Sequence, residues 1–227
     1  MRNSLLLILL AALSAAAQST PFPNGETVSY TANWPSGLAL GEGQIIARQT
    51  PSGVWNFEFT LDASIPGFAV KDQFRSQATA NLCSDVLEKR LQHGKRKAEE
   101  EIEFDRGEGK ATRFTLPKGP KGGETTIPIG SCARDALTFL FQIRRDLAAG
   151  RMPAPATVLF GAPYQVKFDY GGTQKIQGQD ADRLVGTLKG PASEAKFELW
   201  FARGPLRTFL QARVPLAMGT FSLEIAH

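Results

Sequence analysis

Hydrophobic and polar residues alternate along most of the chain, with the period-two spacing of a β-strand that has one buried face. The clearest case is residues 54–62, where Trp55, Phe57, Phe59 and Leu61 share one side and polar residues occupy the other. Similar alternation occurs in three further segments, residues 28–34, 68–74 and 164–170. In the second of these Asp72 falls on the apolar side, which predicts that its carboxylate needs a partner.

Gly- and Pro-rich turns separate further strand-like segments. These segments are residues 38–49, 111–116, 157–160, 173–179, 182–188, 195–201, 206–214 and 218–225. Gly41 and Gly43 weaken the first of them or mark a bulge. Short strands with turns at such regular intervals predict an antiparallel sandwich or barrel.

Residues 83–104 fit two interpretations. The abundance of Glu, Lys, Leu and Ala favours a helix, but Gly94 interrupts the segment and the residues around Ile102 alternate. Because a glycine between two such runs is a turn signal, we favour two strands joined near Gly94.

One long helix is predicted at about residues 131–149. Ser131 is a candidate N-cap, and Asp135 suits the positive end of the helix dipole. Gly150 is placed to end the helix in a left-handed turn. Its apolar face is formed by Ala136, Leu137, Leu140, Phe141, Ile143 and Leu147. A face this wide predicts that the helix packs on the sheet.

The first 17 residues have the organisation of a signal peptide. Arg2 provides the positive start, Leu5–Leu13 the apolar core, and Ala15–Ala17 a small-residue cleavage site before Gln18. The apolar run is shorter than the roughly 20 residues of a transmembrane helix, so we expect no membrane anchor. The sequence thus predicts a periplasmic or secreted protein, with residues 18–227 as a single β-rich domain whose two halves are joined through the helix.

Charge and cysteine content narrow the function further. The whole chain has 26 Lys+Arg and 22 Asp+Glu residues, a mild excess that does not favour a nucleic-acid partner. The two cysteines, Cys83 and Cys132, could form a disulfide in an oxidising compartment or could be two small buried residues.

The chain resembles a family of bacterial exported proteins, domain of unknown function 3108. The similar stretches are Phe22–Glu26 with the strand to Trp34, Phe74–Ser76, Glu103–Arg106, Asp135–Leu137 through Arg144, and the strands up to residues 216–219. The resemblance covers nearly all of residues 18–227. It implies a curved antiparallel sheet, similar in outline to a half-open barrel, and it implies no catalytic residues. The pair Cys83 and Cys132 is not part of the family pattern.

Motifs for catalysis or cofactor binding are missing from the sequence. The histidines, His93 and His227, have no zinc-ligand spacing, and no nucleophile elbow or phosphate-binding loop occurs. We therefore expect no metal and no cofactor. An enzyme would become credible if Asp72, Asp135 and Arg144 met in one cleft.

Aromatic residues on successive strands remain as candidate binding surface. They form either an ordinary core, with the helix as a plug, or a cleft under the helix that takes an apolar ligand. The candidate lining is Trp55, Phe57, Phe59, Phe68, Tyr164 and Phe168. The favoured function is a non-enzymatic envelope protein that binds a lipid-like molecule. The alternative is a scaffold that binds an envelope protein through a sheet edge or the basic loop Lys118–Lys121.

Overall fold

A computed structural model describes residues 20–65, 67–119, 122–191, 194–216 and 219–226, so the predicted signal peptide lies outside the described residues. The described chain is mainly β. The strands are β1 (Glu26–Asn33), β2 (Ala39–Gln49), β3 (Trp55–Ile65), β4 (Phe68–Ala78), β5 (Ser84–His93), β6 (Arg96–Asp105), β7 (Lys110–Thr115), β8 (Glu124–Pro128), β9 (Arg134–Asp135), β10 (Ala156–Leu159), β11 (Pro163–Ile176), β12 (Gln179–Lys189), β13 (Glu194–Ala202), β14 (Phe209–Leu216) and β15 (Gly219–Ile225). The helix α1 spans Ala136–Ala148.

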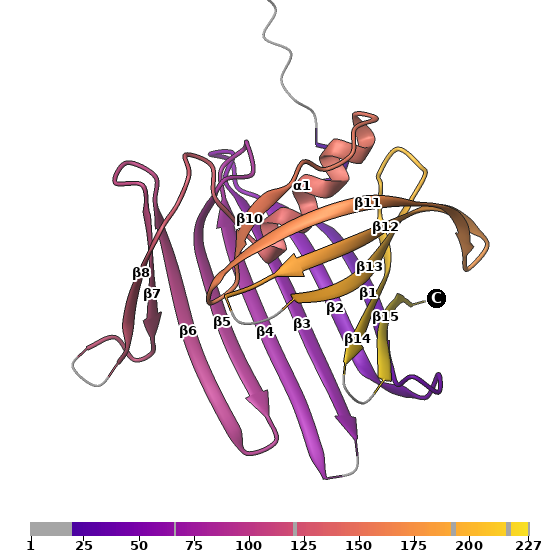
Figure 1. Cartoon of the computed structure of the whole chain (residues 1–227), viewed down its shortest axis with the longest axis horizontal. Helices are drawn as coiled ribbons and strands as arrows, with labels where there is room; N and C mark the ends of the chain where they lie inside the picture. Colours follow the sequence, from indigo (N-terminus) through magenta and orange to yellow (C-terminus); the bar gives the residue numbers. More distant parts are fainter. Residues whose placement is uncertain (1–19, 66, 120–121, 192–193, 217–218, 227) are drawn as a thin grey trace, which may run out of the picture.

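All fifteen strands lie in one large curved sheet. Their order is β8-β7-β6-β5-β4-β3-β2-β1-β15-β14-β13-β12-β11-β10-β9. Neighbours pair antiparallel except β9 and β10, which pair parallel. The first and last strands, β1 and β15, are hydrogen-bonded in the middle of the order, with Tyr30 opposite Ile225. The sheet curls around α1 without closing into a barrel (Figure 1), which confirms the predicted curved, half-open architecture.

The ambiguous segment 83–104 is two strands, as favoured from its turn chemistry. β5 and β6 form a hairpin in which His93 lies opposite Arg96. Gly94 in the turn has a φ of 61°, a left-handed conformation that glycine adopts without strain. Local helix propensity is therefore overridden by strand pairing on both sides.

The helix begins five residues later than predicted. Ser131 is not its N-cap; Asp135 is, and its carboxylate accepts the backbone N–H groups of Leu137 and Thr138 at 2.8 and 2.9 Å. The residues before it are held in extended form, because Arg134 and Asp135 pair with β10 as β9. At the other end Gly150 has a φ of 69°, so it closes the helix as predicted.

The helix plugs one end of the curled sheet. The ring of Phe141 stacks on Phe57 of β3 with centroids 3.9 Å apart, and Phe22 packs edge-on against Phe141 at 4.8 Å. Phe139, which the predicted apolar face did not include, is buried and faces Phe168 of β11. At this end of the sheet the aromatic residues therefore form an ordinary core.

A seam joins β5 to the segment that contains β9, two parts of the sheet far apart in strand order. The backbone N–H of Ser84 donates to the carbonyl of Ala133 at 3.0 Å. Beside it Cys83 and Cys132 form a disulfide, with Cα atoms 4.7 Å apart. Of the two interpretations of the cysteines, the disulfide is the one observed. Such bonds are typical of exported proteins.

The carboxylate of Asp135 lies at the centre of this seam and is fully buried. Its Oδ2 is 2.5 Å from the Ser84 hydroxyl, 2.6 Å from the Ser76 hydroxyl and 2.9 Å from the Thr138 hydroxyl. Ser76 and Thr138 are also 2.7 Å apart. Since each hydroxyl carries one proton, one of these two donates to the carboxylate and the other to its neighbour. Hydroxyl groups from β4, β5 and α1 together therefore offset the cost of burying the Asp135 charge.

A second buried charge ties α1 to β1. The Arg144 guanidinium makes a two-pronged ion pair with Glu26 at 2.5 and 2.8 Å, and only 3% of the Arg144 side chain is exposed. It also donates to the carbonyls of Leu206 and Arg207 at 2.9 and 3.0 Å. Nearby, Tyr30 donates to the Phe209 carbonyl, and burial raises the pKa of the tyrosine hydroxyl, which keeps it neutral.

Replacing Asp135 by alanine is expected to lower the free energy of unfolding by about 3 kcal/mol or more. The substitution removes the helix cap and leaves buried hydroxyls without an acceptor. D169A, in which an exposed carboxylate is removed from β11, is the control and should change stability by less than about 0.5 kcal/mol. Urea unfolding measures both, and equal effects of the two variants would contradict a central role for Asp135.

Replacing Arg144 by methionine is expected to cost about 3–5 kcal/mol, because Glu26 is then left buried without a partner. The double variant E26Q/R144M should recover part of this loss, since no charge remains. K175M, which breaks the exposed pair with Asp180, should have little effect. Strict additivity of E26Q and R144M in urea unfolding would show that the pair is not coupled.

Candidate functional site: an apolar cavity at the open end of the sheet

A cavity of about 500 Å³ opens at the end of the sheet opposite the helix. It is enclosed by β1–β4 on one side and by β14 and β15 on the other. Its lining is Ala32, Asn33, Trp34, Leu40, Phe59, Leu61, Ala63, Ser64, Phe68, Val70, Ala212, Val214, Phe221, Ser222 and Leu223. Three of these residues are polar and uncharged, and the others are apolar. No side chain in the lining is charged, so the site favours an apolar occupant.

Small residues on the inner face make the room for this cavity. Ala32, Ala63 and Ala212 line it directly. At Gly43 of β2, a Cβ atom would lie 3.4 Å from Leu223 and 3.6 Å from Phe59. The register between β1 and β2 shifts at Ala32, opposite Gly41, which confirms the irregularity predicted from the glycines of β2. Near the helix the same strands carry Trp55 and Phe57, which fill the space instead.

The six predicted lining residues divide between the cavity and the core. Phe59 and Phe68 line the cavity. Trp55 and Phe57 are buried in the core under the helix, and Phe168 is buried against Phe139 and Phe197. Tyr164, at the start of β11, is half-buried and is not part of the lining.

Sequence reasoning missed the contribution of the last hairpin to this cavity. Leu223 and Phe221 of β15 reach it because β15 pairs with β1, where Ala32 lies opposite Leu223. The alternation within β15 is a usable signal for an inward face. Local alternation does not reveal that β15 pairs with β1, because this pairing joins residues far apart in the sequence.

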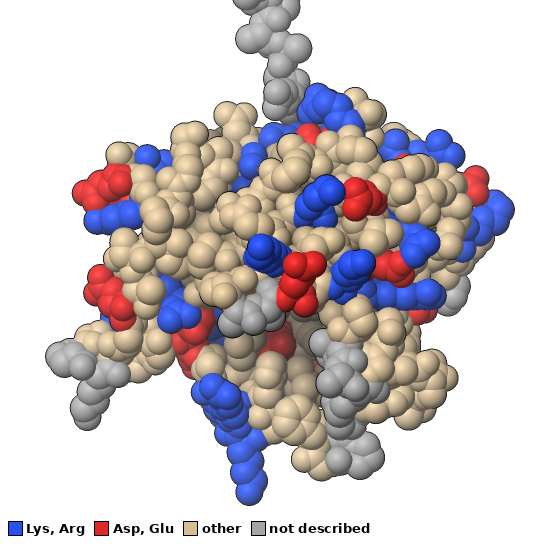
Figure 2. Space-filling model, viewed as in Figure 1, with Lys and Arg blue, Asp and Glu red and all other residues tan. Residues whose placement is uncertain are grey.

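The rim of the cavity carries exposed apolar side chains. Leu38, Phe68 and Val214 are 66%, 44% and 39% exposed. Trp34 packs edge-on against Phe221, with ring centroids 4.9 Å apart. In Figure 2 the described surface beside the lower ends of β14 and β15 is largely uncharged, and basic side chains project at the bottom of the view, below β5 and β6.

An acidic side chain and a histidine border the cavity. Asp72 of β4 lies opposite Leu61, and His93 of β5 lies opposite Val70. The His93 Nε2 atom is 2.9 Å from the Asp72 carboxylate. Asp72 thus has the partner that its position on an apolar face required. Neither residue is part of the cavity lining, and Asp72 also lines a second depression over β4, β5 and β6.

The cluster that would have indicated an enzyme is not formed. Asp72 contacts His93, Asp135 is held by hydroxyls at the seam, and Arg144 pairs with Glu26. Each of the three charges has its own partners at a different place in the fold. Among the described residues no group of three or more His, Cys, Asp or Glu is arranged to hold a metal ion. His227 lies outside the described residues.

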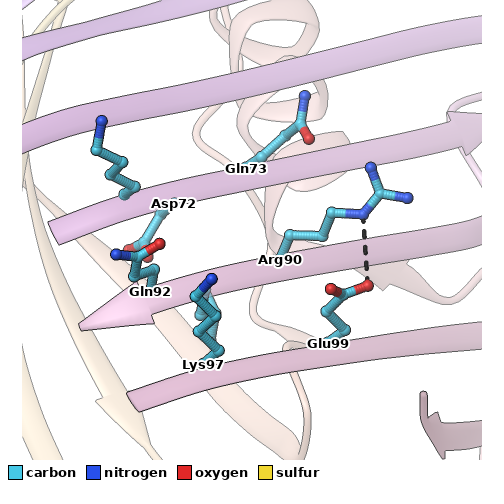
Figure 3. A pocket seen from close by; sticks show the side chains of 8 residues that line it. Asp72, Gln73, Arg90, Gln92, Lys97 and Glu99 are labelled. Atoms are coloured by element: carbon cyan, nitrogen blue, oxygen red, sulfur yellow. Dashed lines mark ion pairs between the residues drawn. The ribbon is translucent and has the colours of Figure 1, made fainter. Parts of the chain in front are cut away.

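A second depression, of about 270 Å³, lies over β4, β5 and β6. Gln73, Arg90, Lys97 and Glu99 line it, and Figure 3 shows the ion pair between Arg90 and Glu99, whose nearest atoms are 3.7 Å apart. Both side chains of that pair are more than half exposed. We interpret this depression as the gaps between solvated cross-strand charges.

The basic loop predicted as an alternative partner site is partly neutralised. The Lys118 ammonium lies 2.5 Å from both Glu101 and Glu103. Pro120 and Lys121 lie outside the described residues. In the described part of the chain, no helix is both long and apolar enough to span a bilayer.

The fold and the site define a half-open antiparallel barrel with a helical plug at one end and an apolar cavity at the other. A family model for "Protein of unknown function (DUF3108)" matches residues 27–226. The chain therefore belongs to this family, as its sequence motifs indicated. No curated protein matches the sequence.

Solved structures support the fold. A crystal structure of a beta-barrel-like protein of domain of unknown function DUF1849 from Brucella abortus aligns with a TM-score of 0.64 and 7% identity. The alignment covers 90% of this chain and 97% of that chain. The Mycobacterium tuberculosis lipoprotein LppX aligns over 89% of this chain and 85% of that chain, at 11% identity, with a TM-score of 0.29. The first likeness is one of fold alone, and the second is too weak for any conclusion.

The division between core and cavity predicts different costs for two neighbouring phenylalanines. F57A should lower the free energy of unfolding by about 3–5 kcal/mol, because it empties a closed part of the core. F59A should cost no more than about half as much, since its side chain already borders an open cavity. Urea unfolding of both variants tests this, and a larger loss for F59A would contradict the assignment.

Proposed function

We propose that this protein is a non-enzymatic carrier of the periplasm or cell envelope that binds a lipid-like ligand in the cavity at the open end of the sheet. The observation that carries the proposal is the apolar lining without a charged side chain. The disulfide supports an oxidising location, and the predicted signal peptide is the expected route to it.

The size and chemistry of the cavity fit one acyl chain or a comparable apolar group. Its volume of about 500 Å³ lies within the roughly 300–1,000 Å³ of small-molecule sites. Burial of apolar surface stabilises such a complex by about 25 cal/mol per Å². Asn33, Ser64 and Ser222 are the polar side chains in the lining, and they provide hydrogen-bonding groups for the polar end of an amphiphile.

The two ends of the sheet differ, one being packed around the helix and the other open, and this difference supports a carrier over a purely structural protein. The core under α1 and the buried pairs of Asp135 and Arg144 stabilise one end. Exposed large apolar side chains also occur elsewhere in the described chain, at Met152, Tyr170 and Leu206, but at the other end Leu38, Phe68 and Val214 are exposed around a single opening, and a group of this kind marks a binding surface.

Filling the cavity is expected to weaken ligand binding while the fold is retained. In A212F the new ring occupies the space beside Leu223, and the affinity for the neutral fluorophore N-phenyl-1-naphthylamine should fall at least about tenfold, or 1.4 kcal/mol. A195F, at an exposed position of β13, makes the same substitution away from the cavity and should bind normally.

Native mass spectrometry of the wild-type protein, purified from the envelope of an exporting host, is the second measurement. A bound lipid that is absent from A212F is the expected result. The carrier proposal fails if the fluorophore binds A212F and wild type equally and no lipid is found in the wild-type protein.

A further inference from the structure

The hairpins β1–β2, β3–β4, β5–β6 and β14–β15 end at the mouth of the cavity, on the side of the sheet away from the helix. Figure 1 shows the described ends of these strands together at the lower side of the molecule; residue 66 of the β3–β4 turn and residues 217–218 of the β14–β15 turn lie outside the described residues. This arrangement follows from the up-and-down order of the strands, in which every second turn lies at the same end. What these turns carry therefore decides what can approach the cavity.

Two kinds of side chain occur side by side on these turns. The apolar kind consists of Leu38 and Phe68, with Val214 close behind. The basic kind is the run Lys95, Arg96 and Lys97 at the β5–β6 turn, all three exposed. Phe68 lies beside the β5–β6 turn, because its ring is 3.1 Å from the place where a Cβ atom on Gly94 would stand.

Glu99 lines the same depression as Lys97, but no acidic side chain of the described residues forms an ion pair with the basic run of the β5–β6 turn. None of the ion pairs between described residues includes Lys95, Arg96 or Lys97. Of the acidic groups near the mouth, Asp62 pairs with Lys71 and Asp72 with His93. Glu42 of β2, opposite Asp62, is exposed and is in none of the ion pairs between described residues, so one negative charge stands against the three basic side chains. The mouth thus combines exposed apolar groups with a net positive turn.

We propose that the open end docks on the surface of an anionic lipid membrane, with the mouth of the cavity against the lipid. This deepens the proposed function and rests on it. Exposed apolar side chains enter the headgroup region while basic side chains bind acidic headgroups, the combination used by peripheral membrane proteins. A ligand could then pass between membrane and cavity without crossing water.

The shape of the mouth favours a lipid surface over a flat protein partner. The apolar groups are on separate turns around an opening, so a rigid partner would bridge a hollow of about 500 Å³ and leave it unpacked. A stable protein interface needs a well-packed centre. Lipid is fluid, so its acyl chains can follow the turns and enter the hollow.

Vesicle co-sedimentation tests the proposal with the full mature chain. Wild type should bind phosphatidylcholine vesicles that contain phosphatidylglycerol and should bind pure phosphatidylcholine weakly. K95Q/R96Q/K97Q should lower the partition coefficient on anionic vesicles roughly 100-fold, about fivefold for each charge. L38S/F68S should weaken binding to both kinds of vesicle.

A matched control separates docking from general attraction of a basic protein. K167Q/K175Q/K189Q removes the same charge from exposed positions on β11 and β12 and should bind anionic vesicles like wild type. Equal loss in the two triple variants would overturn the proposal, as would a wild type that ignores anionic vesicles or dimerises through the mouth.

The fluorophore assay without vesicles distinguishes this failure from failure of the carrier itself. K95Q/R96Q/K97Q should bind N-phenyl-1-naphthylamine like wild type, because those residues do not line the cavity. A wild type that binds the fluorophore but no vesicles sinks only the docking proposal. If wild type binds vesicles but no fluorophore, the result contradicts the carrier proposal and also the proposal that docking serves ligand exchange.

Discussion

The buried carboxylate of Asp135 is the interaction on which the architecture depends most. A sheet of this length has two free edges, and nothing in its local hairpins requires it to curl back toward itself. Asp135 supplies that requirement, because a charge removed from water is tolerated only when several donors converge on it. Those donors come from β4, β5 and α1. The carboxylate therefore stabilises the curled sheet, the seam and the start of the helix at once, and the disulfide holds the same place covalently.

The contacts that hold the curled sheet together lie at the helix end, and this leaves the opposite end free to stay open. The polar contacts of the seam and the Arg144–Glu26 pair gather around the helix, where large aromatic side chains complete the core. The same strands run on beyond this core and carry Gly43, Ala32, Ala63 and Ala212 on their inner faces. No second helix occupies that end in the described chain. Since the strands are already fixed at the seam, the open end is not needed for stability and can remain unfilled.

Local patterns in the sequence located most strands but not their arrangement in space. Alternation located β3 well, and Gly94 identified the β5–β6 turn, because these signals are local. The separate strands predicted at 164–170 and 173–179 were wrong: β11 runs from Pro163 to Ile176, and the two glycines between them lie at a shift of register, not at a turn. The helix start was misplaced because Ser131 satisfies a local capping rule while the tertiary pairing of Arg134 and Asp135 with β10 decides the outcome. For the same reason, only Phe59 and Phe68 of the six predicted lining residues border the cavity. Phe57 and Phe59 share one face of one strand, yet the helix covers only the first. The depth of helix insertion is a tertiary property that no strand pattern contains.

The sequence left open whether the helix is a plug in an ordinary core or covers an apolar cleft, and position along the strands resolves this. α1 is a plug where it packs on Phe57, and it does not extend over Phe59 and Leu61, which lie further along the same inner face and border the cavity. A helix held by two buried charges would have to expose both in order to move, so it is a poor gate. Entry to the cavity must then occur at the opposite end, between the turns, where the side chains are exposed and the strands are joined only by hairpins.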